Sequence, residues 1–412
     1  MRLDSTRRKS RIIMQNGGSL IPLPYHFEVR DYLKTQEPNL WNWFSSAQAQ
    51  ADYTESLRVQ LLKSTYRLDP ESHPDLYRDA EQAKAVLQLD IPLTLYQAQH
   101  SPQPNAALYY IPDEGHLVLS GPVLSLLNAD ELKSVVGHEL AHYHLWRRDG
   151  GEFHVADRLL EAVANDPRAS NSHVQSARWY QLYTEIFADR GSLKVTGNVH
   201  TVVSSLVKIQ TGLPQVSAAS YLKQAEEIFQ KSRVPTAELS HPEAFIRARA
   251  LALWADGGDV AASQISAMIE GTPALDELDL MGQVRLTQLT RRLLEHLLRP
   301  KWFQTDAVLG HAKLFFDDFR TTTSTDPILL EELKFSDPKL REYLCYLLLD
   351  FVAADPELDE LPLAATLDLA KQLEIDAFFE KLVAKELKMK PRDLKRLKET
   401  AAELIAGAEA KP

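Results

Sequence analysis

Apolar residues recur at helical spacing along residues 128–151, which predicts an α-helix with a buried side. The apolar positions are Leu132, Val135, Val136, Ala141 and Leu145. Asn128 is a good N-terminal cap, and Glu131 stands three residues on, where the carboxylate of a capping box belongs. Gly150 and Gly151 end the pattern. The sequence therefore predicts one well-defined helix in this stretch.

A different pattern precedes this helix. Residues 73–88 read as another helix, whereas three short apolar or alternating runs follow at residues 93–96, 107–111 and 116–120. Each of these runs is bounded by Pro, Gly or Asn, as strands commonly are. We therefore predict a small, mainly antiparallel sheet that lies against the 128–151 helix.

The strand pattern disappears after the glycines at 257 and 258, and residues 260–406 read as helices separated by proline-containing breaks. This arrangement predicts an α+β domain followed by an all-helical domain. The predicted domains are an N-terminal extension at residues 1–71, the α+β domain at 72–258 and the helical domain at 259–412.

The composition is that of an ordinary soluble globular protein, with 44% hydrophobic and 25% charged residues. A net charge of −11 argues against a nucleic-acid or anionic-membrane surface over the whole molecule. No apolar run approaches the roughly 18 to 20 residues of a membrane-spanning helix, and the longest candidate, residues 343–354, is interrupted by Asp350. The single cysteine, Cys345, predicts a buried core residue and a reducing, cytoplasmic location.

The N-terminus is basic, and its cationic residues are Arg2, Arg7, Arg8, Lys9 and Arg11. The apolar segment after them is too short for the core of a signal peptide. We interpret this stretch as a disordered tail, with a docking arm for an acidic partner as the alternative. Residues 25–64 then predict one or two helices packed on the following domain.

The 128–151 helix carries His138, Glu139 and His142 in the spacing H-E-x-x-H. Side chains four residues apart lie on one helix face, about 5 to 6 Å apart at Cβ, so both histidines can bind one cation. Glu139 is rotated by about 100° from His138 and can reach a water molecule on that cation. The alternative is a solvated helix face, but the small and apolar neighbours favour a buried metal site of a zinc hydrolase.

Such a site needs a third protein ligand. The extended H-E-x-x-H-x-x-G-x-x-H pattern would need glycine at 145 and histidine at 148, where this chain has Leu145 and Arg148. Glu161 and Glu185 are then the candidates. We favour Glu185 because Asp189 lies one turn further on the same face, where it can orient a ligand or pair with an arginine.

At this point the chain resembles the HtpX-like and prenyl-protease-like zinc metallopeptidases. Their third ligand stands in E-x-x-A-D, which is EIFAD at residues 185–189 here. Their His-Pro followed by an arginine resembles His241, Pro242 and Arg247, and their pair of substrate strands resembles NAAL at 105–108 and EGHLVL at 114–119. The resemblance covers about residues 72 to 258. It implies a zincin-like fold with one zinc ion per chain.

The resemblance also implies roles for individual residues. His138, His142 and Glu185 would hold the zinc, with Glu139 as general base. His241 would stabilise the oxyanion, supported by Arg247 and Asp189, although Ser240 and Glu243 also form a capping box that would make His241 an ordinary first-turn residue. Asn105 and Ala106 would pair with an extended substrate, while Ala107 replaces the phenylalanine of the family pattern.

Two further groups of residues have plainer interpretations. The first group is expected to be surface or hydrogen-bonded histidines, namely His116, His144, His154 and His173. Residues 335–412 weakly resemble tellurite-resistance TerB-like helical domains through the acidic positions Asp350, Asp355, Glu357 and Asp359. The simpler interpretation is a helical hairpin with acidic turns. The functional alternative is a site for a cation or a basic partner.

Together these patterns predict a soluble, cytoplasmic zinc endopeptidase that acts on a protein or peptide and neither binds nucleic acid nor spans a membrane. The helical C-terminal domain could bind a protein partner. One alternative is a catalytically silent scaffold that works through this domain, but metal binding alone would not require Glu139. Another is a regulated enzyme whose extra helices cover the cleft.

Overall fold

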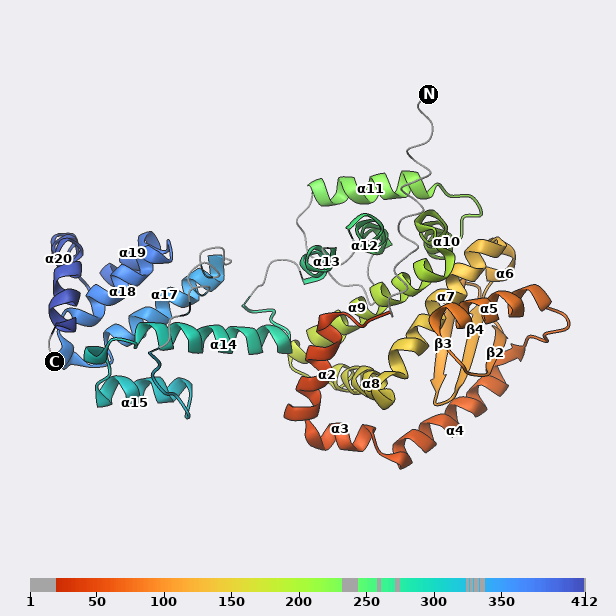
Figure 1. Cartoon of the computed structure of the whole chain (residues 1–412), viewed down its shortest axis with the longest axis horizontal. Coiled ribbons are helices and arrows are strands. Elements are labelled where there is room, and N and C mark those ends of the chain that lie inside the picture. The colour runs from red at the N-terminus through yellow and green to blue at the C-terminus, as the bar shows by residue number, and fades with distance from the viewer. Residues whose placement is uncertain are drawn as a thin grey trace, which may run out of the picture. The chain divides into compact units, whose positions relative to one another are not determined.

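The computed structural model describes residues 20–231, 244–257, 261–270, 275–323 and 338–410, together with Asp326, Leu329 and Leu333. The chain divides into two compact units, Met1–Thr272 and Pro273–Pro412. The first unit contains a four-stranded sheet among helices, and the described part of the second unit is helical (Figure 1). The α+β character predicted for the first unit agrees with this arrangement.

The sheet contains β1 (Thr65–Arg67), β2 (Leu93–Ala98), β3 (Asn105–Ile111) and β4 (Glu114–Ser120), in the order β1-β2-β4-β3. β1 pairs with β2 and β3 pairs with β4 in antiparallel fashion, whereas β2 and β4 are parallel. The sheet is therefore mixed, because β4 inserts between β2 and β3. The sequence pattern missed β1, whose three residues continue directly from a helix. β3 forms one edge of the sheet.

Helices make up most of the rest of the described first unit, and only some of them lie against the sheet (Figure 1). They are α2 (Pro24–Gln36), α3 (Pro38–Phe44), α4 (Ala47–Ser64), α5 (Pro74–Leu87), α6 (Val123–Leu126), α7 (Ala129–Trp146), α8 (Glu152–Ala164), α9 (Asn171–Thr196), α10 (Val199–Thr211), α11 (Ala218–Lys231), α12 (Ala244–Gly257) and α13 (Ala261–Glu270).

Both faces of the sheet are covered. Leu95, Leu108 and Leu117 lie in one apolar cluster with residues of α5 and α7. On the opposite face, Leu57 and Leu61 of α4 join a second cluster with sheet residues. The N-terminal helices thus pack on the sheet and on α8 and α9 and are part of the first unit.

The predicted capping box at the start of α7 is confirmed. Asn128 Oδ1 accepts a hydrogen bond of 2.9 Å from the backbone N–H of Glu131, whose carboxylate accepts one of 3.0 Å from the backbone of Asn128. Glu131 also binds Lys208 of α10 at 2.8 Å. α7 ends at Trp146, earlier than the predicted glycines, and the short 3-10 turn Arg148–Gly151 leads into α8.

α7 and α9 cross at a very short distance. A Cβ atom added to Gly191 of α9 would lie 2.2 Å from the Cβ of Ala141 on α7, so only glycine fits at this crossing. α9 also buries Tyr180, Tyr183 and Phe187 completely or nearly so. This close and heavily buried contact fixes which residues of α9 lie beside the H-E-x-x-H motif.

The described helices of the second unit are α14 (Leu280–Leu297), α15 (Asp306–Phe315), α17 (Pro338–Val352), α18 (Leu361–Gln372), α19 (Asp376–Glu386) and α20 (Pro391–Glu409). They enclose an apolar core that contains Leu348, Phe351 and Phe379. Cys345 is fully buried in this core, as predicted. Within the described residues, no helix is both long and apolar enough to cross a membrane.

Candidate metal centre

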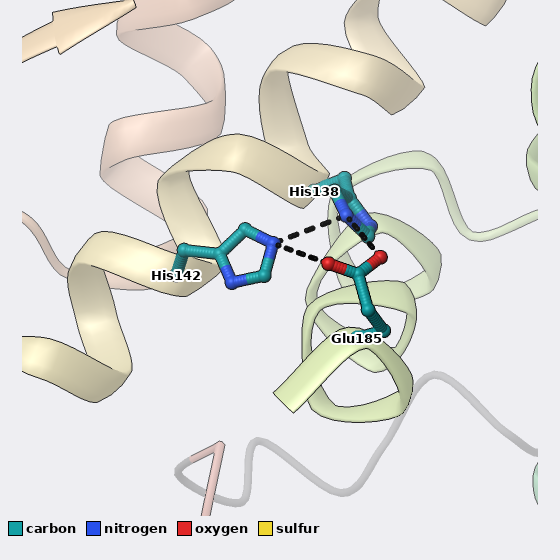
Figure 2. Close-up of side chains that lie close together, drawn as sticks. All are labelled: His138, His142 and Glu185. Atoms are coloured by element: carbon teal, nitrogen blue, oxygen red, sulfur yellow. Dashed lines mark hydrogen bonds and ion pairs between the residues drawn. The ribbon is translucent and has the colours of Figure 1, made fainter. Parts of the chain in front are cut away.

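Three predicted metal ligands converge between α7 and α9. The Nε2 atoms of His138 and His142 lie 3.2 Å apart. One carboxylate oxygen of Glu185 lies 3.4 Å from His138 Nε2, and the other lies 3.5 Å from His142 Nε2. Figure 2 shows the two imidazoles on successive turns of one helix, with the carboxylate facing them from another. Among the described residues, this is the group of His, Cys, Asp and Glu side chains that could hold a metal ion.

The spacing of these atoms fits zinc. Ligand atoms about 2.0 to 2.1 Å from a tetrahedral zinc ion are about 3.3 to 3.4 Å from one another, close to the three distances in this cluster. Two imidazoles and a carboxylate with one position open is also the ligand set of hydrolytic zinc sites. Glu161, the alternative third ligand, is exposed on α8 and is not a member of the cluster.

Asp189 and Arg247 form hydrogen bonds and ion pairs with the predicted metal ligands. Asp189 Oδ1 lies 3.0 Å from His138 Nδ1, and because a carboxylate can only accept, His138 donates its Nδ1–H and turns Nε2 towards the cluster. Arg247 of α12 donates two hydrogen bonds of 2.7 Å to Asp189. It also lies 3.0 Å from Glu185. The predicted proximity of Asp189 and Arg247 to the metal ligands is therefore present in the structure.

The surroundings impose opposite protonation preferences on the two histidines. Burial opposes the charged form of His138, but hydrogen bonds with Asp189 and Glu185 outweigh it and raise its pKa to about 10. Burial lowers the pKa of His142 to about 4. Burial also opposes ionisation of Glu185, yet Arg247 and the histidines hold its pKa well below the usual range. A neutral His142 and an ionised Glu185 are the forms that bind a cation, whereas a protonated His138 has to release its Nε2 proton when a cation binds.

Glu139 lies one residue after His138 and faces the same cleft from α7. Glu139 is buried, with 7% of its surface exposed to solvent. Burial raises the pKa of the Glu139 carboxyl to about 7, although the charges of His138 and Arg247 act in the opposite direction. The backbone of Leu108 on β3 hydrogen bonds to it. A carboxyl group with a pKa near neutrality can take up and release a proton during one reaction cycle.

The cluster opens into a cleft of about 630 Å³. Residues 104–108, at and just before the start of β3, form one wall, and α7, α8, α9, α10 and α12 contribute the other lining residues. Asn105 and Ala106 belong to this wall, and β4 pairs with them through Ser120 and Leu119. Both residues therefore lie on an edge strand beside the cluster, and their pairing with substrate stays a prediction.

His241 lies outside the described residues, so its predicted role is not tested by the structure. Two cleft residues were missed by the sequence analysis. The indole of Trp146 stacks on His142, with ring centroids 5.3 Å apart, and its position four residues after His142 was an available signal. Asp157 of α8 also lines the cleft, and nothing in the sequence distinguished it from its acidic neighbour Glu161.

The four remaining histidines examined in the sequence are not metal ligands in this cluster. His144 bonds to the backbone carbonyls of Leu87 and Leu20, and His173 bonds to Ser170. The other two have aromatic neighbours, since His116 bonds to Tyr96 and the ring of His154 lies against Tyr110.

The acidic turn of the second unit has local partners. Asp355 accepts hydrogen bonds from Thr305 and from the backbone of Glu357, and Asp350 lies 3.1 Å from His311. Asp359 is exposed. These carboxylates do not form a group that could hold a metal ion within the described residues. Their contacts agree with the plainer interpretation of a capped turn.

Part of the first unit is similar to known proteins. Residues 72–255 match peptidase family M48. Plastoglobule-localized metallopeptidase 48, chloroplastic, of Arabidopsis thaliana is 30% identical over 200 residues, which are 44% of this chain and 56% of that protein. A protease HtpX homolog of Thermoplasma volcanium is 30% identical over 156 residues, or 37% of this chain and 44% of that protein. No solved structure matches.

The chain spans about half the length of the curated relatives that it matches. The matched segment contains His138, Glu139, His142 and Glu185, so the family match and the converging ligands concern the same part of the fold. Residues 72–255 therefore match peptidase family M48, and this segment is similar to the HtpX-like metallopeptidases.

Proposed function

We propose that this protein is a zinc-dependent endopeptidase. The observation that carries the proposal is the convergence of His138, His142 and Glu185 on one point, beside the Glu139 carboxyl group and the edge of the sheet. M48 metallopeptidases depend on zinc, and the ligand spacing here fits that metal. Protein or peptide substrates follow from the family, and a cytoplasmic location remains a prediction from the single cysteine.

The chemistry divides between the metal and the protein. Zinc held by these ligands would polarise the scissile carbonyl and make a water molecule more acidic. Glu139 accepts the proton of the attacking water and then transfers it to the leaving amine. Its raised pKa suits both steps, because the group must exchange a proton near neutral pH.

The surrounding residues hold the reacting groups in place. Asp189, braced by Arg247, keeps the His138 ring in one orientation and one tautomer. In this proposal His241 donates a hydrogen bond to the developing oxyanion, as the resemblance to the family implies.

Substrate would bind along β3 as an extra strand. The outer backbone groups near Asn105 and Ala106 would pair with an extended peptide, which requires no particular side chain. The cleft continues past the metal ligands in two directions, towards Ser134 and α10 and towards Trp146 and α8. Peptide on both sides of the scissile bond could therefore be accommodated, which supports an endopeptidase.

Glu139→Gln tests this proposal. The amide cannot accept the proton, so hydrolysis of unfolded casein should fall by about 10² to 10⁴, while zinc content and melting temperature stay near those of the wild type. Glu161→Gln, a change of the same kind on an exposed residue of the same unit, should leave hydrolysis unchanged.

Two results would contradict the proposal. Undiminished hydrolysis by the Glu139→Gln protein would exclude this residue as the base. A wild-type protein that binds one zinc ion yet cleaves neither casein nor a randomised peptide library would point instead to a catalytically silent scaffold that acts through its second unit.

A further inference from the structure

Asp157 is a cleft residue that the proposed chemistry does not use. It lies on α8 and lines the cleft together with Trp146, Gln181 and Thr184. Among the described residues, the other titratable groups that line the cleft have a place in the proposed site, namely His138, Glu139, His142, Glu185, Asp189 and Arg247. Asp157 is therefore a carboxyl group in the cleft that is free to interact with substrate.

Two arginines near Asp157 among the described residues are directed elsewhere. Arg247 is bound to Asp189 and Glu185. The guanidinium of Arg158, the next residue in the chain, lies 4.3 Å from the centre of the Tyr53 ring and 5.4 Å from that of Phe44, towards the N-terminal helices. No ion pair of Asp157 occurs within the described part of the chain.

The surroundings of Asp157 favour the binding of a positively charged group. Burial, followed by the carboxylates of Glu161 and Glu185, raises its pKa to about 7. Pairing with a cation stabilises a partly desolvated carboxylate that faces other carboxylates more than it stabilises an exposed carboxylate. The reason is that less water screens the charges. A cationic group of the substrate would supply that charge.

We propose that Asp157 makes the enzyme select a lysine or arginine side chain in the part of the cleft between α8 and Trp146, on one side of the scissile bond. This inference rests on the proposed peptidase function. Trp146 offers a flat ring for the aliphatic stem or the cation, and Gln181 and Thr184 offer further polar groups. The opposite part of the cleft, lined by Val202, Leu206 and Ile209 of α10, has a more apolar wall.

The test starts from cleavage-site profiling. A library of N-acetylated ten-residue peptides is digested with the zinc-loaded protein, and the residues around each cleaved bond are identified by mass spectrometry. Lys and Arg should be enriched at one position on one side of the bond. The same library without acetylation is digested in parallel, because acetylation removes the charge of the terminal amine. Cleavage confined to the unacetylated peptides would show that an N-terminal amine, and not a side chain, is recognised, which would overturn the proposal.

Kinetics on a matched peptide pair then test Asp157 itself. The pair differs only by Lys or Gln at the enriched position, and kcat/KM for the Lys peptide should be larger by about 30-fold or more, the effect of losing one partner of a buried charge pair. Asp157→Asn should bring this ratio close to one. Glu161→Gln changes an acidic residue one turn further along α8, outside the cleft, and should keep the ratio.

A binding measurement makes the result independent of turnover. The Glu139→Gln protein should bind a fluorescent Lys peptide more tightly than the Gln peptide, and the Glu139→Gln/Asp157→Asn protein should not. If Asp157→Asn does not fold, Asp157→Ser replaces it. Hydrolysis without a preference for basic residues, or a preference that survives in the Asp157 variants, would overturn this inference alone, whereas absence of hydrolysis by the wild type would contradict the peptidase function.

Discussion

The interiors of the two units differ in their polar groups. The first unit buries titratable residues on α7 and α9, including Glu131, Glu139, His142 and Asp189, and their partners come from other helices or strands. The second unit buries fewer charged side chains within the part that the structure describes. Among its described residues, the buried carboxylates are Asp279 and Asp355, and each caps a helix by accepting hydrogen bonds from local backbone N–H groups.

This difference indicates where the chemistry lies. A buried charge destabilises a fold unless it is paired, so it is expected where the charge serves a purpose other than packing. In the first unit one such pair, Glu131 with Lys208, joins α7 to α10. Glu139, His142 and Asp189 lie in or beside the metal-binding cluster. The two buried carboxylates of the second unit accept hydrogen bonds at helix ends, and this capping accounts for their burial.

Among the variants proposed to test this difference between the units, the largest loss of activity is expected when Glu185 is replaced. Removing the carboxylate in Glu185→Ala leaves two ligands, so the protein should lose most of its zinc and essentially all hydrolysis. Metal analysis after dialysis, with Glu161→Ala as the control, measures this. Zinc released by Glu161→Ala and retained by Glu185→Ala would show that the wrong carboxylate has been assigned.

A smaller effect is expected at His241. If its side chain stabilises the oxyanion, His241→Ala should lower kcat by about 10² while zinc content and KM change little, because the contact forms only as charge develops. Steady-state kinetics and thermal unfolding on this one variant separate the two interpretations. A normal kcat with a lowered melting temperature would make His241 a first-turn helix residue.

The pH dependence tests the buried base. Hydrolysis needs ionised Glu139, so kcat/KM should rise with pH until this group is ionised and should fall about tenfold per unit below its pKa. Burial places that pKa near 7, and a bound cation favours the ionised form, so the midpoint should lie at or below about 7. Zinc content must be followed at each pH, because protonated histidines release metal. A rate that is constant or increases as the solution is made more acidic would contradict this role.

The smallest effect on activity is expected in the second unit. Leu348 is completely buried, and Leu348→Ala should cost about 2 to 5 kcal/mol of stability through loss of packing. Thermal unfolding should show this loss, while zinc content and kcat/KM at a lower temperature stay near those of the wild type. Reduced hydrolysis by a folded, zinc-loaded Leu348→Ala protein would show that the second unit also affects catalysis. That result would favour an enzyme regulated by its second unit.

The sequence determined the features that depend on neighbouring positions. The Asn128–Glu131 capping box and the facing of His138 and His142 follow from three- and four-residue spacing, which the helix itself converts into proximity. The three longer strands could be located because each is a short apolar or alternating run between turn residues. The geometry of a single helix or strand is the same in every fold. Patterns over a few neighbouring residues can therefore be interpreted before the fold is known.

Tertiary structure decided the rest. Whether Glu185 or Glu161 faces the histidines depends on how α9 crosses α7, and the contact of Gly191 with Ala141 sets that crossing. The parallel pairing of β2 with β4 and the place of Asp157 in the cleft likewise arise from elements far apart along the chain. Periodicity shows which face of an element is apolar but not which partner covers it, because that choice depends on the packing of the whole unit.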